Sequence, residues 1–209
     1  MKEAGGGVGR GLLVVVSAPS GGGKTTLVRA VLAADSALQL SVSYTTRPPR
    51  PGERSGRDYV FVDDAEFERL RRAGRFAEWA EVFDHRYGTP RAPLDAALAE
   101  GRTVLLDVDI QGARSIKRVY GEDAVGVFVV PPSFAALAER LRARGTDSEA
   151  QIRRRLERAR EEVGAAAEPG VYDYAITNRE RDTAAAELAA VIVAERCRIG
   201  RRAVSVPEH

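Results

Sequence analysis

The stretch from Leu12 to Leu27, LLVVVSAPSGGGKTTL, decides the fold of this chain. A short apolar run breaks into a glycine-rich turn, and the chain then continues into a segment that predicts a helix. In such a unit, backbone N–H groups and the helix N-terminus converge on an anion, while a lysine adds charge and a hydroxyl can ligate Mg²⁺. The stretch therefore predicts a loop that binds nucleotide phosphates. Its residues are Ala18, Pro19, Ser20, Gly21, Gly22, Gly23, Lys24, Thr25 and Thr26.

One position departs from the phosphate-loop pattern G-x-x-x-x-G-K-[ST], because Ala18 stands where the first glycine normally does. A glycine-rich linker that happens to contain Lys and Thr is the alternative interpretation. The rarity of lysine argues against it, since only three of the 32 Lys and Arg residues are lysines and Lys24 is one of them. A compact ammonium fits between phosphate oxygens, whereas a guanidinium is a planar fork.

Composition sets limits on the class of protein. A length of 209 residues suits one α/β unit with insertions, and a net charge of +2 is too balanced for a protein that coats nucleic acid. A single cysteine, Cys197, excludes an intrachain disulfide and fits a cytoplasmic location. The apolar run before the phosphate loop is too short for a signal peptide, and no segment is long enough to span a membrane. We therefore expect a soluble protein without nucleic-acid or membrane partners.

Along the chain, short apolar runs alternate with helical patterns, which predicts an α/β fold with a parallel sheet and helices on both of its faces. Between Ser41 and Pro93 the texture changes to aromatics, prolines and short alternating runs, which indicates an inserted, partly β subdomain. The expected strands are 12–16, 103–107, 125–130 and 174–177, and the expected helices are 24–34, 110–119, 133–144, 148–163 and 183–199.

Two further features bear on chemistry. The run VLLDVD ends in Asp107 and Asp109, and an acid at the carboxyl end of such a strand can hold Mg²⁺, for which Asp107 is the candidate together with Thr25. The segment SYTTRPPRPGE, from Ser43 to Glu53, places two arginines in a proline-stiffened loop that suits capture of a phosphate monoester. A solvated turn is the alternative for that loop.

The phosphate loop APSGGGKT, the run S-x-S-x-T-T-R-x-P-R-x-G-E, the later G-x-D-Y and the run L-D-V-D-x-Q-G occur in this order between about Leu12 and Arg198, and together they resemble guanylate kinase. The resemblance implies a P-loop NTPase core with a GMP-binding subdomain and a helical lid, catalysing ATP + GMP to ADP + GDP with Mg²⁺, and dGMP as a further substrate. It implies a core of residues 11–40, 94–131 and 166–203, a GMP-binding subdomain of about 41–93 and a lid of about 132–165. Residues 1–10 form a flexible leader and 204–209 a tail.

The resemblance also assigns residues to the nucleotides. By motif match, Arg47, Arg50, Tyr59 and Tyr87 contact the GMP phosphate, Ser43, Glu78 and Thr89 read the guanine, and Gly88 and Asp109 complete the GMP site. Guanine offers N1–H and N2–H₂ side by side, so one carboxylate accepts both, whereas adenine lacks this donor pair. The segment Asp84-His85-Arg86 departs from the family pattern.

Downstream, the match assigns catalytic roles to Lys24 and to the lid arginines Arg140, Arg144 and Arg155, and it places Asn178 beside the ATP adenine. The arginines would neutralise charge on the transferring group. Arg153, Arg154 and Arg158 are expected to pair with nearby glutamates. The reaction needs no protein nucleophile, and closure of the subdomains is expected to exclude water.

Three other interpretations stay open, as does a homo-oligomeric state. A guanylate-kinase-like scaffold module would bind phosphorylated peptides without catalysis, but such modules tend to lose the phosphate loop and the guanine-reading serine that this chain retains. A kinase for another nucleoside monophosphate would lack the set Ser43, Glu78 and Thr89. A generic P-loop ATPase or GTPase would leave the arginine-proline loop unexplained.

Overall fold

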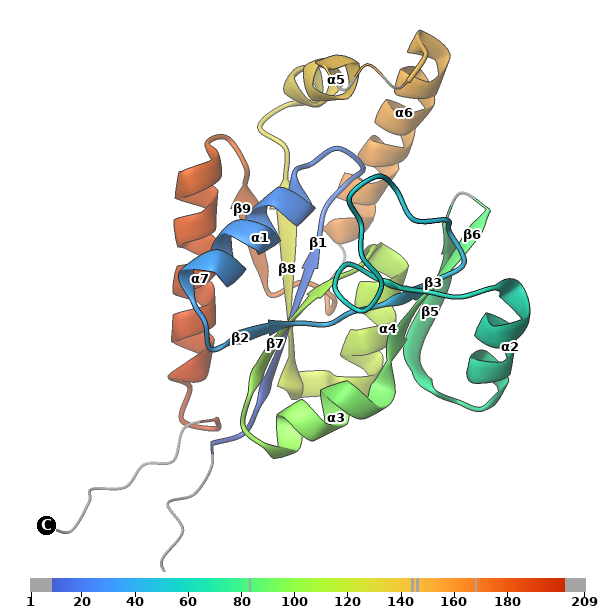
Figure 1. The fold of residues 1–209 in the computed structure, drawn as a ribbon. Coiled ribbons are helices and arrows are strands. Elements are labelled where there is room, and N and C mark those ends of the chain that lie inside the picture. The colour runs from blue at the N-terminus through green and yellow to red at the C-terminus, as the bar shows by residue number, and fades with distance from the viewer. Residues whose placement is uncertain (1–8, 83, 144, 146, 168, 202–209) are drawn as a thin grey trace, which may run out of the picture.

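The structure is a computed structural model that describes residues 9–82, 84–143, 145, 147–167 and 169–201 (Figure 1). Its core is a parallel sheet of five strands in the order β2-β7-β1-β8-β9. This order brings the end of β1 beside the end of β7, with Val16 opposite Asp107. The strands are β1 (Leu12–Ser17), β2 (Leu38–Leu40), β7 (Thr103–Asp107), β8 (Ala124–Val130) and β9 (Tyr174–Thr177).

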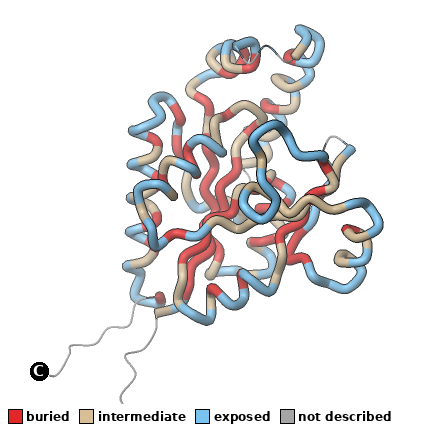
Figure 2. Tube along the Cα trace, in the orientation of Figure 1, coloured by how far each residue is buried: buried red, intermediate tan, exposed pale blue. Residues whose placement is uncertain are grey.

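The apolar run of β1 is continuous because both faces of the sheet are covered. Leu12, Val14 and Val16 belong to an apolar cluster with α1 (Lys24–Ala34) and α7 (Arg181–Arg196). Leu13 and Val15 belong to another cluster with α3 (Arg91–Ala99) and α4 (Ile110–Tyr120), which a short 3-10 helix, Gly121–Asp123, links to β8. Figure 2 shows the central strands β1, β7 and β8 buried along nearly their whole length between these layers. The alternation of side chains along β1 thus divides it between two cores.

A second sheet has the order β4-β3-β6-β5 and is built from the segment between β2 and α3. Its strands are β3 (Tyr44–Thr45), β4 (Val60–Phe61), β5 (Phe76–Val82) and β6 (His85–Pro90). The helix α2 (Asp64–Arg72) packs on one face, where the rings of Phe67 and Phe76 lie 4.8 Å apart. Asp63 caps this helix by accepting a hydrogen bond from the Glu66 N–H.

Two helices, α5 (Phe134–Ala143) and α6 (Glu149–Ala166), lie beyond the carboxyl ends of the core strands (Figure 1). They have an apolar cluster of their own, in which Leu137 and Leu141 pack against Ile152. Ser148 and Gln151 form a capping box that starts α6. This pair of helices therefore has a small core separate from that of the parallel sheet.

The predicted α/β fold is confirmed, and each predicted strand and helix of the core has a counterpart. The largest difference in bounds is α7, expected at 183–199, which begins at Arg181 and ends at Arg196. Its last turn tightens, because the Cys197 N–H also donates to the Ala194 carbonyl and the Arg198 N–H donates to the Glu195 carbonyl, each three residues back. The core elements β2 and α3 and the peripheral α2 were not predicted. The boundary expected between residues 93 and 94 falls inside α3.

The ends of the described chain lie together. The Arg10 N–H donates to the Arg201 carbonyl at 2.8 Å, and the Arg10 side chain pairs with Asp123. Of the expected leader, residues 1–8 lie outside the described residues, as does the expected tail. Across the part of the chain that is described, none of the helices combines the length and the hydropathy that crossing a bilayer requires.

Candidate functional site

The phosphate loop connects β1 to α1, and backbone conformation and close packing require glycine at some of its positions. Gly21 and Gly23 have φ of 90° and 88°, in the left-handed region that other residues rarely adopt. A Cβ on Gly23 would lie 2.4 Å from Nδ2 of Asn178, which donates to the Gly22 carbonyl at 2.8 Å. Ala18, at the departure from the pattern, packs against the apolar cluster of α1 and α7. The phosphate loop is thus fixed by Asn178, which directly follows β9.

Lys24, Thr25 and Asp107 converge at the start of α1. The Lys24 ammonium donates to the Val108 carbonyl at 2.6 Å and pairs with Oδ1 of Asp107 at 2.7 Å. The Thr25 hydroxyl donates to Oδ2 of the same carboxylate at 3.0 Å. The structure therefore brings together the residues predicted to hold phosphate and Mg²⁺, because β1 and β7 are neighbours in the sheet.

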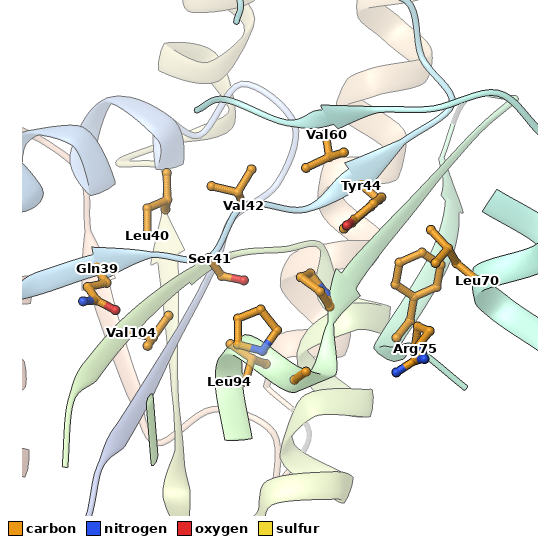
Figure 3. A pocket seen from close by; sticks show the side chains of 14 residues that line it. Gln39, Leu40, Ser41, Val42, Tyr44, Val60, Leu70, Arg75, Leu94 and Val104 are labelled. Carbon is orange, nitrogen blue, oxygen red and sulfur yellow. The ribbon is translucent and has the colours of Figure 1, made fainter. Parts of the chain in front are cut away.

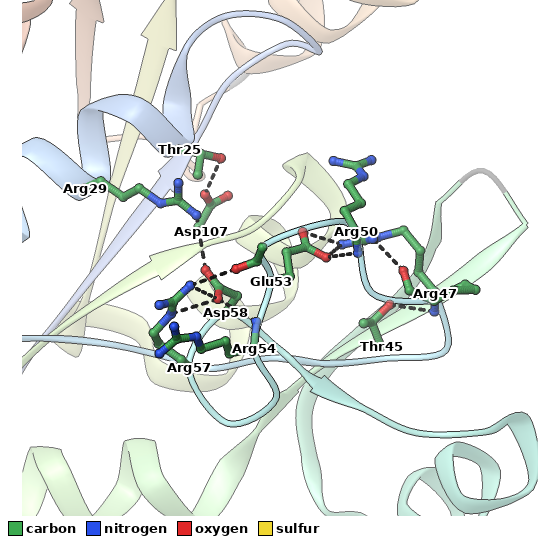
Figure 4. A network of polar contacts seen from close by, with 12 residues as sticks. Thr25, Arg29, Thr45, Arg47, Arg50, Glu53, Arg54, Arg57, Asp58 and Asp107 are labelled. Carbon is green, nitrogen blue, oxygen red and sulfur yellow. Dashed lines mark hydrogen bonds and ion pairs between the residues drawn. The ribbon is translucent and has the colours of Figure 1, made fainter. Parts of the chain in front are cut away.

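The loop from residue 46 to residue 59, here called the Arg-Pro loop, is shaped by Arg47 and Glu53 (Figure 4). Arg47 is only 9% exposed, and its Nη2 donates to both carboxylate oxygens of Glu53, at 2.8 and 2.9 Å. Although burial opposes its charge, hydrogen bonds with Glu53 and Tyr87 raise the pKa of Arg47. Glu53 also accepts from the Arg50 N–H at 2.7 Å, while the Arg50 side chain is exposed. The carboxylate of Glu53 thus positions both predicted phosphate ligands, Arg47 and Arg50.

Two tyrosines flank this pair. The Arg47 guanidinium lies 5.5 Å from the centre of the Tyr59 ring, and the rings of Tyr59 and Tyr87 are 5.9 Å apart, edge to face. Burial, reinforced by the negative charge of Asp107, raises the pKa of Tyr59 to about 12. The Tyr59 phenol therefore stays protonated near neutral pH and can donate a hydrogen bond to an anion.

Glu78, Thr89 and Ser43 lie on neighbouring strands of the second sheet and form a chain of polar contacts. The Thr89 hydroxyl donates to Oε1 of Glu78 at 2.5 Å, and the Ser43 and Thr89 hydroxyl oxygens are 3.5 Å apart. Glu78 is only 7% exposed, and this burial, with the nearby charge of Asp109, raises its pKa to about 7. This burial excludes a solvated glutamate on a surface segment.

Two predicted members of the site have structural duties. Asp109 caps α4, since its Oδ1 accepts from the Gly112 N–H at 2.8 Å. Gly88 is buried, and a Cβ there would lie 2.9 Å from the ring of Phe76. Gly112 brings the start of α4 against Glu78, because a Cβ on it would lie 3.0 Å from Oε2. Sequence reasoning had missed these packing roles.

The helices α5 and α6 send two arginines toward the phosphate loop. Nη2 of Arg140 donates to the Asn178 carbonyl at 2.9 Å. Arg155 lies with Nη1 3.4 Å from the Ser20 hydroxyl and Nη2 3.3 Å from Asp147. Arg144 lies outside the described residues. The ion pair expected between Arg158 and a nearby glutamate forms with Glu162, four residues later on α6, with Nε and Oε1 2.9 Å apart.

Asp58, whose role sequence reasoning missed, ties the Arg-Pro loop to itself and to the core (Figure 4). Its carboxylate accepts from the Arg54 N–H at 2.9 Å and pairs with Arg57 at 2.7 Å and with Arg29 of α1 at 3.2 Å. These contacts lower the pKa of Asp58, the backbone hydrogen bond of Arg54 most of all. The only signal in the sequence was its position next to Tyr59 in the run Gly56-Arg57-Asp58-Tyr59.

Comparison with known proteins places the whole chain. The family model described as guanylate kinase matches residues 10–195. The guanylate kinase of Nitrobacter winogradskyi is 50% identical over 193 residues, covering 92% of this chain and 87% of that protein. The guanylate kinase of Aromatoleum aromaticum is 50% identical over 188 residues, covering 90% of each.

The fold agrees with these relatives. The crystal structure of guanylate kinase from Anaplasma phagocytophilum superposes with a TM-score of 0.75 at 35% identity, covering 92% of this chain and 90% of that one. The chain therefore belongs to the guanylate kinase family, whose members phosphorylate GMP to GDP with ATP.

Proposed function

We propose that the site transfers the γ-phosphoryl group of ATP to GMP by direct in-line displacement, with no covalent intermediate on the protein. The GMP phosphate is largely dianionic near neutral pH, since the second pKa of a phosphate monoester is about 6. Its oxygen can therefore attack without a protein base, and catalysis reduces to positioning and to neutralisation of charge. Lys24, Arg140 and Arg155 supply the positive charge, and Arg144 does so by family resemblance.

The observation that carries the choice of acceptor is the buried contact between Glu78 and Thr89, at 2.5 Å. In our proposal the Glu78 carboxylate accepts from the guanine N1–H and N2–H₂, while Ser43 and Thr89 supply hydroxyls beside it. An adenine in the same place would leave the carboxylate without donors, which is a costly state for a buried charge. The acceptor is therefore GMP or dGMP, since none of these groups reads the ribose hydroxyl.

The GMP phosphate is assigned to the Arg-Pro loop, where Arg47, Arg50, Tyr59 and Tyr87 act together. Arg50 is exposed and Arg47 is fixed by Glu53, so one guanidinium adapts to the ligand while the other is preorganised. Gly88, next to Tyr87, packs on Phe76, while Asp109 was matched to a residue near the nucleotide base and caps α4.

ATP is assigned to the phosphate loop, residues 18–26, whose inward N–H groups hold its phosphates. Asn178 was matched to a residue beside the adenine, and its contacts support a role in positioning as well. Its amide donates to Gly22 and its carbonyl receives Arg140, so it joins the loop to α5. This residue therefore links the ATP site to a charge that acts on the transferring group.

The residues present fit Mg²⁺ brought in with ATP. Thr25 and Asp107 offer a hydroxyl and a carboxylate 3.0 Å apart, and Mg²⁺ commonly takes one or two protein oxygens with phosphates and waters. No group of three or more His, Cys, Asp or Glu side chains suited to a metal occurs in the described part of the chain, so the nucleotide itself would complete the shell. When bound, the ion neutralises charge on the ATP phosphates.

A coupled assay for ADP with Mg-ATP and each of GMP, dGMP, AMP, CMP and UMP tests this proposal. We expect activity with GMP and dGMP only, and we expect Lys24→Ala to abolish it. Activity with AMP would overturn the roles of Ser43 and Glu78. Absence of activity with every acceptor would instead favour the scaffold module, which binds without catalysis. We place the enzyme in the cytoplasm, whose reducing conditions suit a chain with a single cysteine, Cys197.

A further inference from the structure

A cavity of about 430 Å³ lies between the two sheets, apart from the residues assigned to GMP and ATP (Figure 3). We call it the hinge cavity, since its lining includes Gln39–Val42, which lead from the core into the second sheet, and Pro90 with Ala92–Leu94, which lead back. Thr89 and Pro90 are consecutive on β6, so their side chains leave opposite faces of that strand. Thr89 contacts Glu78, while Pro90 lines the hinge cavity.

The walls of the hinge cavity are mainly apolar. Leu40, Val42, Tyr44, Val60 and Leu70 all line it, and each is only partly buried. These side chains come from the edge of the core sheet, from β3 and β4 and from α2, so the wall is assembled from several elements. Concave sites of this volume, with apolar walls and a few polar groups, are typical of small-molecule sites.

Two polar groups in the lining have unused hydrogen-bonding capacity. The backbone of Ser41 is fixed by its N–H donating to the Leu105 carbonyl at 2.8 Å. Its hydroxyl oxygen is buried and has no hydrogen-bond partner within the described structure, and Figure 3 shows it pointing into the hinge cavity. Arg75 also lines the hinge cavity, is exposed, and makes no side-chain hydrogen bond or ion pair with the residues described. A buried hydroxyl without a partner is costly, and a ligand atom would relieve that cost.

We propose that the hinge cavity binds a small aromatic monoanion, with its ring system against the apolar walls, a polar atom at the Ser41 hydroxyl and its negative group at the Arg75 guanidinium. An uncharged hydrocarbon would leave both polar groups unused, and a nucleotide would bring several charges against an apolar wall. The volume of about 430 Å³ accommodates two or three fused or linked rings.

The position of the hinge cavity links this ligand to the reaction. Its two walls belong to the core sheet and to the second sheet, so any movement of one sheet against the other changes its shape. A ligand that touches both walls favours the arrangement in which they fit it. The ligand then changes the affinity for the nucleotide by a fixed factor, and the nucleotide changes the affinity for the ligand by the same factor.

The probe for the test is anilinonaphthalene sulfonate, an aromatic monoanion whose fluorescence rises in apolar surroundings, titrated onto the full chain. We expect one saturable site per chain. The titration is repeated at a fixed concentration of ADP with increasing GMP. The apparent affinity of the probe should level off at a finite value, because GMP at a separate, linked site changes the probe's affinity by a fixed factor. An affinity that falls without limit would place the probe in the nucleotide site and overturn the proposal.

Matched variants locate the probe. Ala92 lines the hinge cavity and is exposed on α3, while Ala96 is exposed on the same helix and does not line it. Ala92→Trp should weaken binding at least about tenfold by filling the space, whereas Ala96→Trp should leave it unchanged. Equal effects of the two substitutions would contradict the assignment.

A second pair of variants tests the charge. Arg75→Gln should weaken binding of the sulfonate about three- to tenfold, and it should leave binding of the uncharged analogue phenylnaphthylamine unchanged. Arg118→Gln, at an exposed position of α4 away from the hinge cavity, should affect neither probe. Both arginines are exposed, so neither substitution threatens folding, and equal loss of both probes in Arg75→Gln would refute the role of its charge.

Discussion

Arg29 on α1 donates to Asp58 of the Arg-Pro loop, with Nη2 and Oδ1 3.2 Å apart. The helix that begins at the phosphate loop is thereby connected to the loop assigned to the GMP phosphate. Asp58 is adjacent to Tyr59, so the contact lies next to a predicted ligand. A charge on the ATP side therefore helps to set the position of groups on the GMP side.

From this contact we predict that Arg29→Ala raises the KM for GMP about two- to fivefold, the range of an exposed ion pair, and leaves the KM for ATP unchanged. Initial rates with each substrate varied in turn measure both constants. Arg69→Ala is the matched control, because Arg69 forms an exposed pair with Glu66 on α2. A rise in the KM for ATP alone would show that Arg29 acts on the phosphate loop instead.

The raised pKa of Glu78, about 7, predicts how GMP binding depends on pH. The carboxylate must be ionised to accept two donors from guanine, so the Kd for GMP should increase as the pH falls through the pKa of Glu78. Calorimetric titration with GMP between pH 5.5 and 8.5, roughly one to two units either side of that pKa, measures this. Glu78→Gln should bind GMP weakly and keep only the pH dependence that comes from the phosphate of GMP, whose second pKa is about 6. An unchanged profile in Glu78→Gln would assign the whole titration to a group other than Glu78.

The same pKa predicts an effect on stability. Folding raises the pKa of Glu78 from the ordinary 4.5, so the folded state holds more protons between these two values, and stability decreases as the pH rises through that window. Glu78→Gln removes this penalty, and its free energy of unfolding should gain on that of the wild type by roughly 1–3 kcal/mol between pH 4.5 and pH 8. Urea unfolding at the two pH values tests it, and an unchanged difference would contradict it.

Gly23 should be intolerant of a side chain for two separate reasons, its φ of 88° and the 2.4 Å approach of Asn178 to the added Cβ. Gly23→Ala should weaken ATP binding at least about tenfold, because the loop must move away from Asn178 to admit the methyl group. Gly74→Ala is the control for a positive φ outside the phosphate loop, since Gly74 has φ of 64° and open space around its Cβ position, and it should leave ATP binding unchanged. Equal loss of ATP affinity in both variants would contradict a local effect at the phosphate loop.

Lys24 should be needed for the chemical step more than for binding of the acceptor. Lys24→Ala is expected to lower kcat about a thousandfold or more, with the Kd for GMP unchanged, and Lys24→Arg should not restore activity because a guanidinium cannot take the place of the compact ammonium. Single-turnover assays and calorimetry separate the two quantities. Recovery of kcat in Lys24→Arg would show that charge alone suffices.

The elements predicted from the sequence are those with local signals. The strand β1 and the phosphate loop are contiguous, so their pattern carries its own structural information. By contrast, β2 has only three residues and α3 contains Pro93 in its first turn, where proline is tolerated although it usually signals a loop. Both elements depend on packing against partners elsewhere in the chain.

The site was predicted in its residues more than in its contacts. The convergence of Lys24, Thr25 and Asp107 follows from the adjacency of β1 and β7, since the carboxyl ends of parallel strands form the ligand-binding edge of such a sheet. The contacts of Asn178 with Gly22, of Arg29 with Asp58 and of Arg155 with Ser20 join segments far apart in the chain. No spacing in the sequence encodes these contacts, since they depend on how complete elements pack.

The hydrogen bond between the Arg10 N–H and the Arg201 carbonyl has a consequence for connectivity. Since Arg10 and Arg201, at the two ends of the described chain, are neighbours, a short linker could join them, and the chain could then be opened at an exposed turn elsewhere. The architecture is in this sense suited to circular permutation, because the positions of the termini can change while the packing of the elements stays the same.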